Sequence, residues 1–195
     1  PVRHLAILSI AAAGLNPDDI VSGDLEAVNV SSAGWFDPAD GATTRFTPLL
    51  SSSENAGPMD ASRLRFLTNP ADLLTGFNPT GDRYALAVRL SGAAAASIEA
   101  PAEVAGEPLA ESGEAGINVL LFADSDLLTD RMWVQVQPLF GATAFADNGN
   151  LAINAVDNML GNRDLISIRT RATSARPFGR VEAIRVAAER SFRQT

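Results

Sequence analysis

The sequence predicts an α/β domain in which a mixed β-sheet is flanked by helices. Apolar runs of strand length recur at residues 5–10, 84–90 and 117–123. Segments with helical periodicity follow, most clearly at residues 148–160 and 180–193. Strands followed by helices are typical of α/β folds. The sequence contains no internal repeat, which a solenoid would require.

The composition divides the chain into three parts. Its 195 residues, 46% of them hydrophobic, are enough for one sizeable globular domain. Residues 99–116 consist mainly of Ala, Glu, Gly and Pro, and such a segment buries too little apolar surface to offset its ordering entropy. We therefore expect residues 1–98 to form the N-terminal part of the domain, residues 99–116 a mobile acidic loop, and residues 117–195 the C-terminal β-α-α-β-α part.

Strands are expected throughout the N-terminal part. The runs at residues 5–10 and 84–90 have strand character, the second with clear alternation of large and small side chains. Residues 43–53 indicate another strand, with Pro48 near its start or on a sheet edge. The pattern of residues 24–34 is ambiguous between strand and helix.

Turn residues separate these segments. Residues 16–19 (NPDD) favour a turn or the cap of a short helix, and residues 35–41 form a loop by their Pro, Asp and Gly content. Asn69, followed by Pro70, is expected to cap a short helix that ends near Gly76.

The central stretch of the chain runs from residue 117 to residue 161. Residues 117–123 lack polar alternation, as expected for a strand covered on both faces. Asp124, Ser125 and Asp126 follow at its carboxyl end, where open α/β sheets present functional groups. Residues 127–140 are expected to be partly helical.

A helix with two distinct faces is expected after Asp147 or Asn148, with Gly161 as its terminator. The spacing of three and four residues places an apolar set and a polar set on different sides. The apolar set is Leu151, Ile153, Val156, Met159 and Leu160, and the polar set is Asn150, Asn154, Asp157 and Asn158. A strand at 165–168 and a final helix at 180–193 complete the prediction.

Three interpretations of the acidic turn remain open. An apolar strand that ends in D-x-D resembles the nucleophile motif of haloacid-dehalogenase-type phosphatases, in which Mg²⁺ assists attack by the first aspartate. Alternatively, Asp124, Asp126 and Asp130 supply oxygen ligands for a weak metal site, although they do not form an EF-hand. The third interpretation, which we favour, is that these carboxylates and the amides of Asn150 and Asn154 satisfy backbone groups.

Composition excludes several function classes. The net charge of −8 argues against nucleic-acid binding. The chain has no cysteine and no lysine, and its single histidine is His4, so thiol chemistry, a P-loop lysine and a Schiff base are excluded. No segment is long and apolar enough for a membrane span. Arg169, Arg171 and Arg176 form a cluster that suits an acidic partner, or that pairs with the chain's own carboxylates.

The motifs of this chain, taken in order, resemble those of GldG-type auxiliary components of ABC transporters, a family named for gliding motility. The matching segments are 24–34 (DLEAVNVSSAG), 41–53 (GATTRFTPLLSSS), the Asn-Pro segment at 69–81, 84–92 (YALAVRLSG), 119–130 (VLLFADSDLLTD), 148–161 (NGNLAINAVDNMLG) and 165–182 (LISIRTRATSARPFGRVE).

This resemblance implies an extracytoplasmic domain related to glutamine-amidotransferase-like or flavodoxin-like folds, without catalytic residues or a cofactor. It implies partnership with the permease and ATPase subunits of a bacterial inner-membrane transport system. The membrane anchor, and a further N-terminal α/β portion, are expected outside residues 1–195. The function expected is thus that of a non-catalytic binding or interaction domain, with a metal-dependent phosphohydrolase as the alternative.

Overall fold

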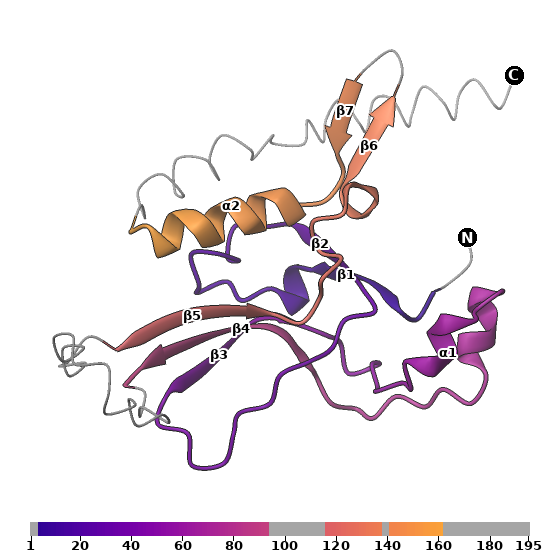
Figure 1. Cartoon of the computed structure of the whole chain (residues 1–195), viewed down its shortest axis with the longest axis horizontal. Helices are drawn as coiled ribbons and strands as arrows, with labels where there is room; N and C mark the ends of the chain where they lie inside the picture. The colour runs from indigo at the N-terminus through magenta and orange to yellow at the C-terminus, as the bar shows by residue number, and fades with distance from the viewer. Residues whose placement is uncertain (1–3, 94–115, 138–140, 162–195) are drawn as a thin grey trace, which may run out of the picture.

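A computed structural model describes residues 4–93, 116–137 and 141–161 (Figure 1). The described part contains strands, two α-helices and three 3-10 helices (η). In chain order they are β1 (Ile7–Ala11), η1 (Ala12–Gly14), β2 (Ala27–Ser31), β3 (Arg45–Ser51), α1 (Ser62–Arg65), η2 (Pro70–Leu74), β4 (Ala85–Gly92), β5 (Ile117–Phe122), η3 (Asp130–Met132), β6 (Val134–Gln137), β7 (Gly141–Ala144) and α2 (Asn148–Met159).

The strands form three small sheets, ordered β1-β2, β3-β4-β5 and β6-β7. The chain is therefore mixed in secondary structure, as expected for the α/β class. The finer prediction of one mixed sheet is not met in the described ranges, where every strand pair is antiparallel. A parallel pair needs a crossover connection that packs on the sheet. The helical turns between β3 and β4 span only four and five residues, so they do not act as such a crossover.

The segment 24–34, whose pattern is ambiguous between strand and helix, contains the strand β2. Two local predictions are confirmed. Pro48 lies in β3, which is an edge strand of its sheet, where a missing N–H costs least. The Oδ1 atom of Asn69 accepts a hydrogen bond from the N–H of Ala71 at 3.1 Å, and Gly76 follows the helical turn with a φ of 71°.

One prediction about the central stretch is wrong. β5 is not covered on both faces, because Ile117 and Val119 are each 37% exposed. The prediction that residues 127–140 are partly helical is met by η3, and the strand β6 follows it. The alternation of Val134 and Val136 with glutamines has the period of a strand, and this periodicity prevails.

Helix α2 begins and ends as predicted, but the two predicted sets do not separate onto different sides, because Leu151 is buried together with Asn154 and Asn158. Asn148, Asn154 and Asn158 are buried, together with Leu151 and Ala155. The outer face instead carries large apolar side chains, namely Ile153, Val156, Met159 and Leu160, which are 47–70% exposed. The asparagines are tolerated inside because each has hydrogen-bond partners in other segments.

The hydrophobic core lies where the β1-β2 pair and α2 meet the three-stranded sheet (Figure 1). Val28 and Val30 of β2 and Leu49 and Leu50 of β3 are at most 2% exposed, and Leu151 of α2 is fully buried. The parts of the chain before and after residues 99–116 therefore contribute to one core. Among the described helices, none combines the length and apolar character that a membrane crossing requires.

Other predictions fall outside the described residues. These are the conformation of the acidic segment up to residue 115, the strand at 165–168, the final helix at 180–193 and the cluster of Arg169, Arg171 and Arg176. They stay predictions.

Candidate functional site

The acidic turn after β5 is tied to the backbone around it. The Oδ2 atom of Asp124 accepts the N–H of Ser31 at 2.7 Å, and its Oδ1 atom accepts the N–H of Asp126 at 2.7 Å. The carboxylate of Asp126 lies 3.5 Å from the guanidinium of Arg131, with both side chains largely exposed. Ser125 is exposed. Asp124 therefore joins the end of β5 to the end of β2.

Asp124 is one of three side chains that close the outer edge of β2. Asp147 accepts the N–H of Ala27 at 3.2 Å through Oδ2, and Asn148 accepts the N–H of Asn29 at 3.0 Å through Oδ1. The Nδ2 atom of Asn148 also donates to the carbonyl of Asn29 at 2.7 Å. With the bond from Ser31 to Asp124 included, the N–H groups of Ala27, Asn29 and Ser31 each have a side-chain acceptor. These are every second N–H along this edge. Side chains thus replace the neighbouring strand that an edge lacks.

The structural interpretation of the turn is therefore close to what the structure shows, with a different donor. The donors to Asp124 are the N–H of Ser31 at the end of β2 and the N–H of Asp126 within the turn. Asn148, absent from the predicted set, reaches the segment after the turn by donating to the carbonyl of Leu127 at 2.8 Å. Asn150 donates to Asp147 at 2.9 Å, and Asn154 donates to the carbonyl of Val21 at 3.3 Å.

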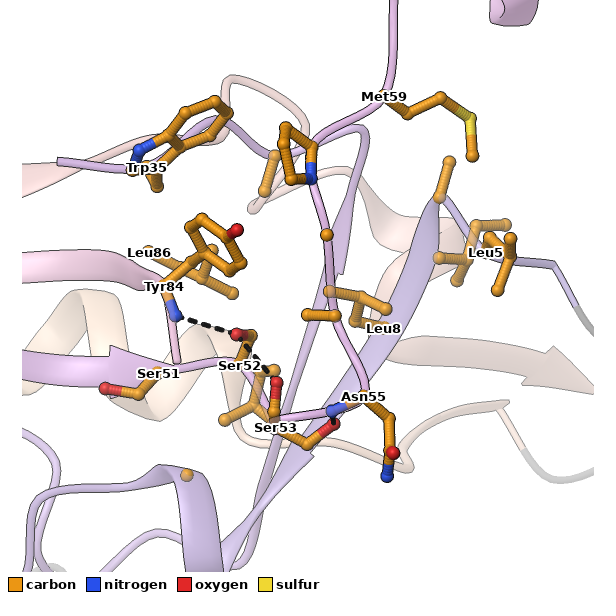
Figure 2. A pocket seen from close by; sticks show the side chains of 18 of the residues that line it. Leu5, Leu8, Trp35, Ser51, Ser52, Ser53, Asn55, Met59, Tyr84 and Leu86 are labelled. Carbon is orange, nitrogen blue, oxygen red and sulfur yellow. Dashed lines mark hydrogen bonds between the residues drawn. The ribbon is translucent and has the colours of Figure 1, made fainter. Parts of the chain in front are cut away.

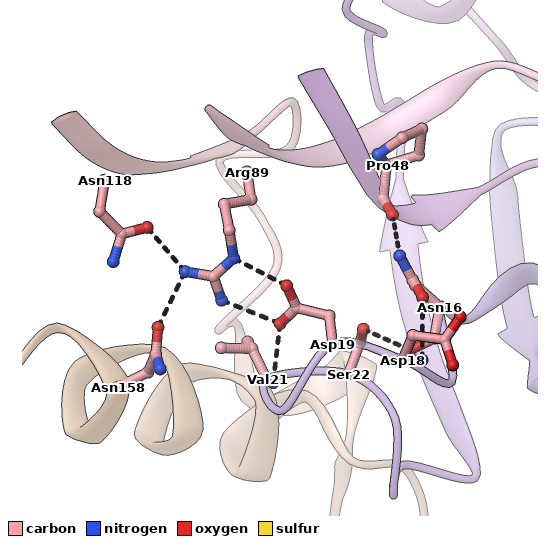
Figure 3. Close-up of polar contacts among 9 residues, drawn as sticks. All are labelled: Asn16, Asp18, Asp19, Val21, Ser22, Pro48, Arg89, Asn118 and Asn158. Atoms are coloured by element: carbon pink, nitrogen blue, oxygen red, sulfur yellow. Dashed lines mark hydrogen bonds and ion pairs between the residues drawn. The ribbon is translucent and has the colours of Figure 1, made fainter. Parts of the chain in front are cut away.

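A second polar network, which the sequence did not indicate, surrounds Arg89 of β4 (Figure 3). Its guanidinium forms a bidentate pair with Asp19, with distances of 2.7 Å from Nε and 2.9 Å from one terminal nitrogen. The other terminal nitrogen donates to Asn118 of β5 at 2.7 Å and to Asn158 of α2 at 2.9 Å. Because these side chains come from a loop, two strands and a helix, the network fixes the packing of the domain.

These arrangements offer little to a metal ion. The part of the chain that the structure describes has no group of three or more His, Cys, Asp or Glu side chains that could hold one. Both carboxylate oxygens of Asp124 already accept N–H groups. The D-x-D spacing that suggested a phosphohydrolase is therefore part of a backbone-bracing turn.

An apolar cleft of about 700 Å³ lies elsewhere in the domain (Figure 2). Strand β1 and the residues that precede it line the cleft, together with most of residues 51–61. Trp35, Tyr84 and Leu86 also line it, with the two aromatic rings 5.4 Å apart in an edge-to-face arrangement. A cleft of this size with predominantly apolar walls is typical of binding sites.

Two hydroxyl groups of the cleft, those of Ser52 and Tyr84, have partners within the protein. Ser52 is 3% exposed, and its Oγ atom accepts the N–H of Tyr84 at 2.8 Å and donates to the carbonyl of Ser53 at 3.2 Å. The hydroxyl groups of Tyr84 and Thr80 are 2.8 Å apart. No sequence pattern indicates this cleft, because its walls come from segments far apart in the chain.

A smaller cavity of about 520 Å³ also contacts β1. Ile7 and Ser9 line it together with Leu64, Arg131 and Phe145. Since side chains of a strand alternate between its two faces, β1 is accessible along the apolar cleft and also from this second cavity.

Comparisons with known proteins support one assignment. A protein-family model described as an ABC-type uncharacterized transport system matches residues 1–155 of the chain. The search of curated proteins gives no match, and neither does the search of solved structures.

Proposed function

Because the chain belongs to the family of auxiliary proteins of ABC-type transport systems, we propose that it is a non-catalytic binding module of such a system. The observation that carries this proposal is the apolar cleft lined by β1 and most of residues 51–61. Its walls offer shape and apolar surface, and the hydroxyl groups of Ser52 and Tyr84 are engaged in bonds within the protein. Such a site favours binding over bond cleavage.

The polar residues that suggested chemistry support the same proposal. Asp124 accepts two backbone N–H groups, and Arg89 and Asp19 pair with each other. A nucleophile or a metal ligand needs a carboxylate oxygen directed at a substrate or an ion. We therefore rank the phosphohydrolase alternative below the binding role.

The finer parts of the proposal come from the resemblance to GldG-type components. In this proposal the domain lies on the extracytoplasmic side of a bacterial inner membrane and acts with the permease and ATPase subunits. Segments outside residues 1–195 anchor the protein, and the complete extracytoplasmic region has a glutamine-amidotransferase-like architecture. The apolar cleft would then contact another protein of the complex.

The test is co-purification of the protein with co-expressed permease and ATPase subunits. Met59 lines the cleft and is half-buried, so Met59→Glu places a charge on the binding surface without entering the core. We expect this variant to lower the recovered subunits at least tenfold, since an unpaired charge is costly at an apolar interface. Ala39→Glu, in an exposed loop, is the matched control and should leave recovery unchanged.

The enzyme alternative has its own test. The purified chain is assayed for hydrolysis of p-nitrophenyl phosphate with Mg²⁺, in parallel with Asp124→Asn. Turnover that disappears in Asp124→Asn would refute the non-catalytic role.

A further inference from the structure

We propose that the free edge of β1 binds an extended segment of a partner polypeptide as an added β-strand. The inference rests on the proposed function and deepens it, because it names the kind of partner that the cleft accepts. It is carried by the geometry of β1, by the two cavities beside it and by the charge of the chain.

Within residues 4–93, 116–137 and 141–161, the hydrogen-bond pattern leaves one side of β1 open. Ala27, Asn29 and Ser31 of β2 direct their N–H groups away from β1, toward side chains of other segments. In an antiparallel pair the direction of the backbone groups alternates, so Val28 and Val30 are the residues that bond to β1. Their partners are Ile10 and Leu8.

It follows that Ser9 directs its N–H and C=O groups outward, as Ala11 does its N–H; the carbonyl of Ala11 belongs to the N-cap of η1. Both residues are exposed, and among the described strands only β2 pairs with β1. The N–H of Ser32 donates to the carbonyl of Ala6 at 2.7 Å, which extends the same alternation by one step. The outward edge therefore offers the row of donors and acceptors that another strand requires.

The two edges of the β1-β2 pair differ in how they are closed. Asp124, Asp147 and Asn148 cover the outer edge of β2 with side-chain acceptors. The edge of β1 lacks a comparable cover among the described residues and borders the apolar cleft instead. A protein that closes one edge with three polar side chains has left the other available for pairing.

The cavities match the alternation of an incoming strand. Leu8 and Ile10 line the apolar cleft on one face of β1, whereas Ile7 and Ser9 line both cavities. A strand beside β1 would direct alternate side chains into the apolar cleft and into the smaller cavity. The partner segment therefore has apolar residues at every second position and smaller or polar residues between them.

The occupant is a separate polypeptide and not a second copy of this chain. Residues of the 51–61 stretch line the same cleft as β1. Two copies, each with a net charge of −8, would repel each other. Basic residues at the ends of the partner segment would complement this charge.

The first experiment uses a defined peptide, Ac-Arg-Leu-Thr-Leu-Thr-Leu-Arg-NH2, added to the whole chain labelled for amide hydrogen exchange. We expect the N–H groups of Ser9 and Ala11 to exchange rapidly without the peptide and to become protected at least tenfold with it. Two peptides N-methylated at the Leu or at the Thr positions test the direction of pairing. Only one of them should lose binding, because only one set of amides faces β1.

Ser9→Pro removes one outward N–H group without removing a bond between β1 and β2. Proline is tolerated at such edge positions, and we expect peptide affinity to fall about fivefold or more. Ser9→Ala keeps the N–H and is the matched control, with unchanged affinity. If Ser9→Pro does not fold, the exchange measurement on the native chain decides alone.

Several results would overturn the inference. They are no binding of the peptide, binding without protection of Ser9 and Ala11, or equal effects of the two N-methylated peptides. Self-association of the chain that Ser9→Pro suppresses would show that the edge pairs with a second copy. If Ser9→Pro folds and still recovers the transporter subunits while Met59→Glu does not, the strand-addition inference fails and the proposed function stands.

Discussion

Replacement of Arg89 by methionine tests whether the network around this residue holds the domain together. Arg89→Met keeps a long apolar side chain but removes both bonds to Asp19 and those to Asn118 and Asn158. The side chains of Arg89 and Asp19 are only 14% and 10% exposed. The variant therefore leaves a carboxylate largely buried without its cation.

The magnitude follows from that burial. Removal of one partner from a buried ion pair costs about 3–5 kcal/mol in the free energy of unfolding. We expect the lower end, about 3 kcal/mol, because some solvent reaches the pair. For a domain of this size that loss lowers the melting temperature by roughly 6–12 °C.

Urea denaturation followed by circular dichroism measures this loss, and Arg131→Met is the matched control. Arg131 pairs with Asp126 at 3.5 Å, with side chains 69% and 45% exposed, and such a surface pair contributes no more than about 1 kcal/mol. In Asp19→Asn/Arg89→Met the two losses should not add, because both substitutions disrupt the same pair. Equal small effects of Arg89→Met and Arg131→Met would refute the assignment of Arg89 as a packing hub.

Three further predictions concern other single contacts. Asp124→Ala should lower the free energy of unfolding by about 2–4 kcal/mol, because two hydrogen bonds to a charged acceptor are lost. Recovery of the transporter subunits should stay unchanged. Unchanged stability with lost recovery would contradict the bracing role. Gly149→Ala should lower the free energy of unfolding by about 1–3 kcal/mol, since an added Cβ lies 2.6 Å from the ring of Trp133. In a Trp133→Leu background the same substitution should raise the free energy of unfolding, because alanine is a better helix former than glycine. Hydrogen bonds from the backbone and the hydroxyl of Ser62 lower the pKa of Asp60 below its ordinary value of 3.8. Asp60 therefore stabilises the fold at pH values above its pKa in the unfolded chain, and this effect is lost as the pH falls through its pKa in the folded chain. A carboxyl titration by NMR that places the pKa of Asp60 in the folded chain at or above 3.8 would disprove this.

The fold was predictable where neighbouring residues decide the conformation. Asn69 accepts the N–H of Ala71, two residues away, and Pro48 restricts β3 to an edge without reference to any other segment. The helix from Asn148 to Met159 also follows from its own periodicity. In the candidate site, the sequence indicated that Asp124 accepts hydrogen bonds from backbone N–H groups. It did not indicate that one of these groups is the N–H of Ser31.

The sequence by itself determined the position of several strands and turns, which chemistry is impossible without cysteine or lysine, and which family the motifs resemble. The tertiary structure alone decided which face of α2 is buried, because periodicity defines two faces without assigning either to the core. Asn148 is buried and bonds to Asn29, which lies 119 residues away in the sequence. Local sequence patterns do not reveal partners at such a separation. The pairing of Arg89 with Asp19 and the cleft beside β1 depend in the same way on segments that meet only in the folded chain.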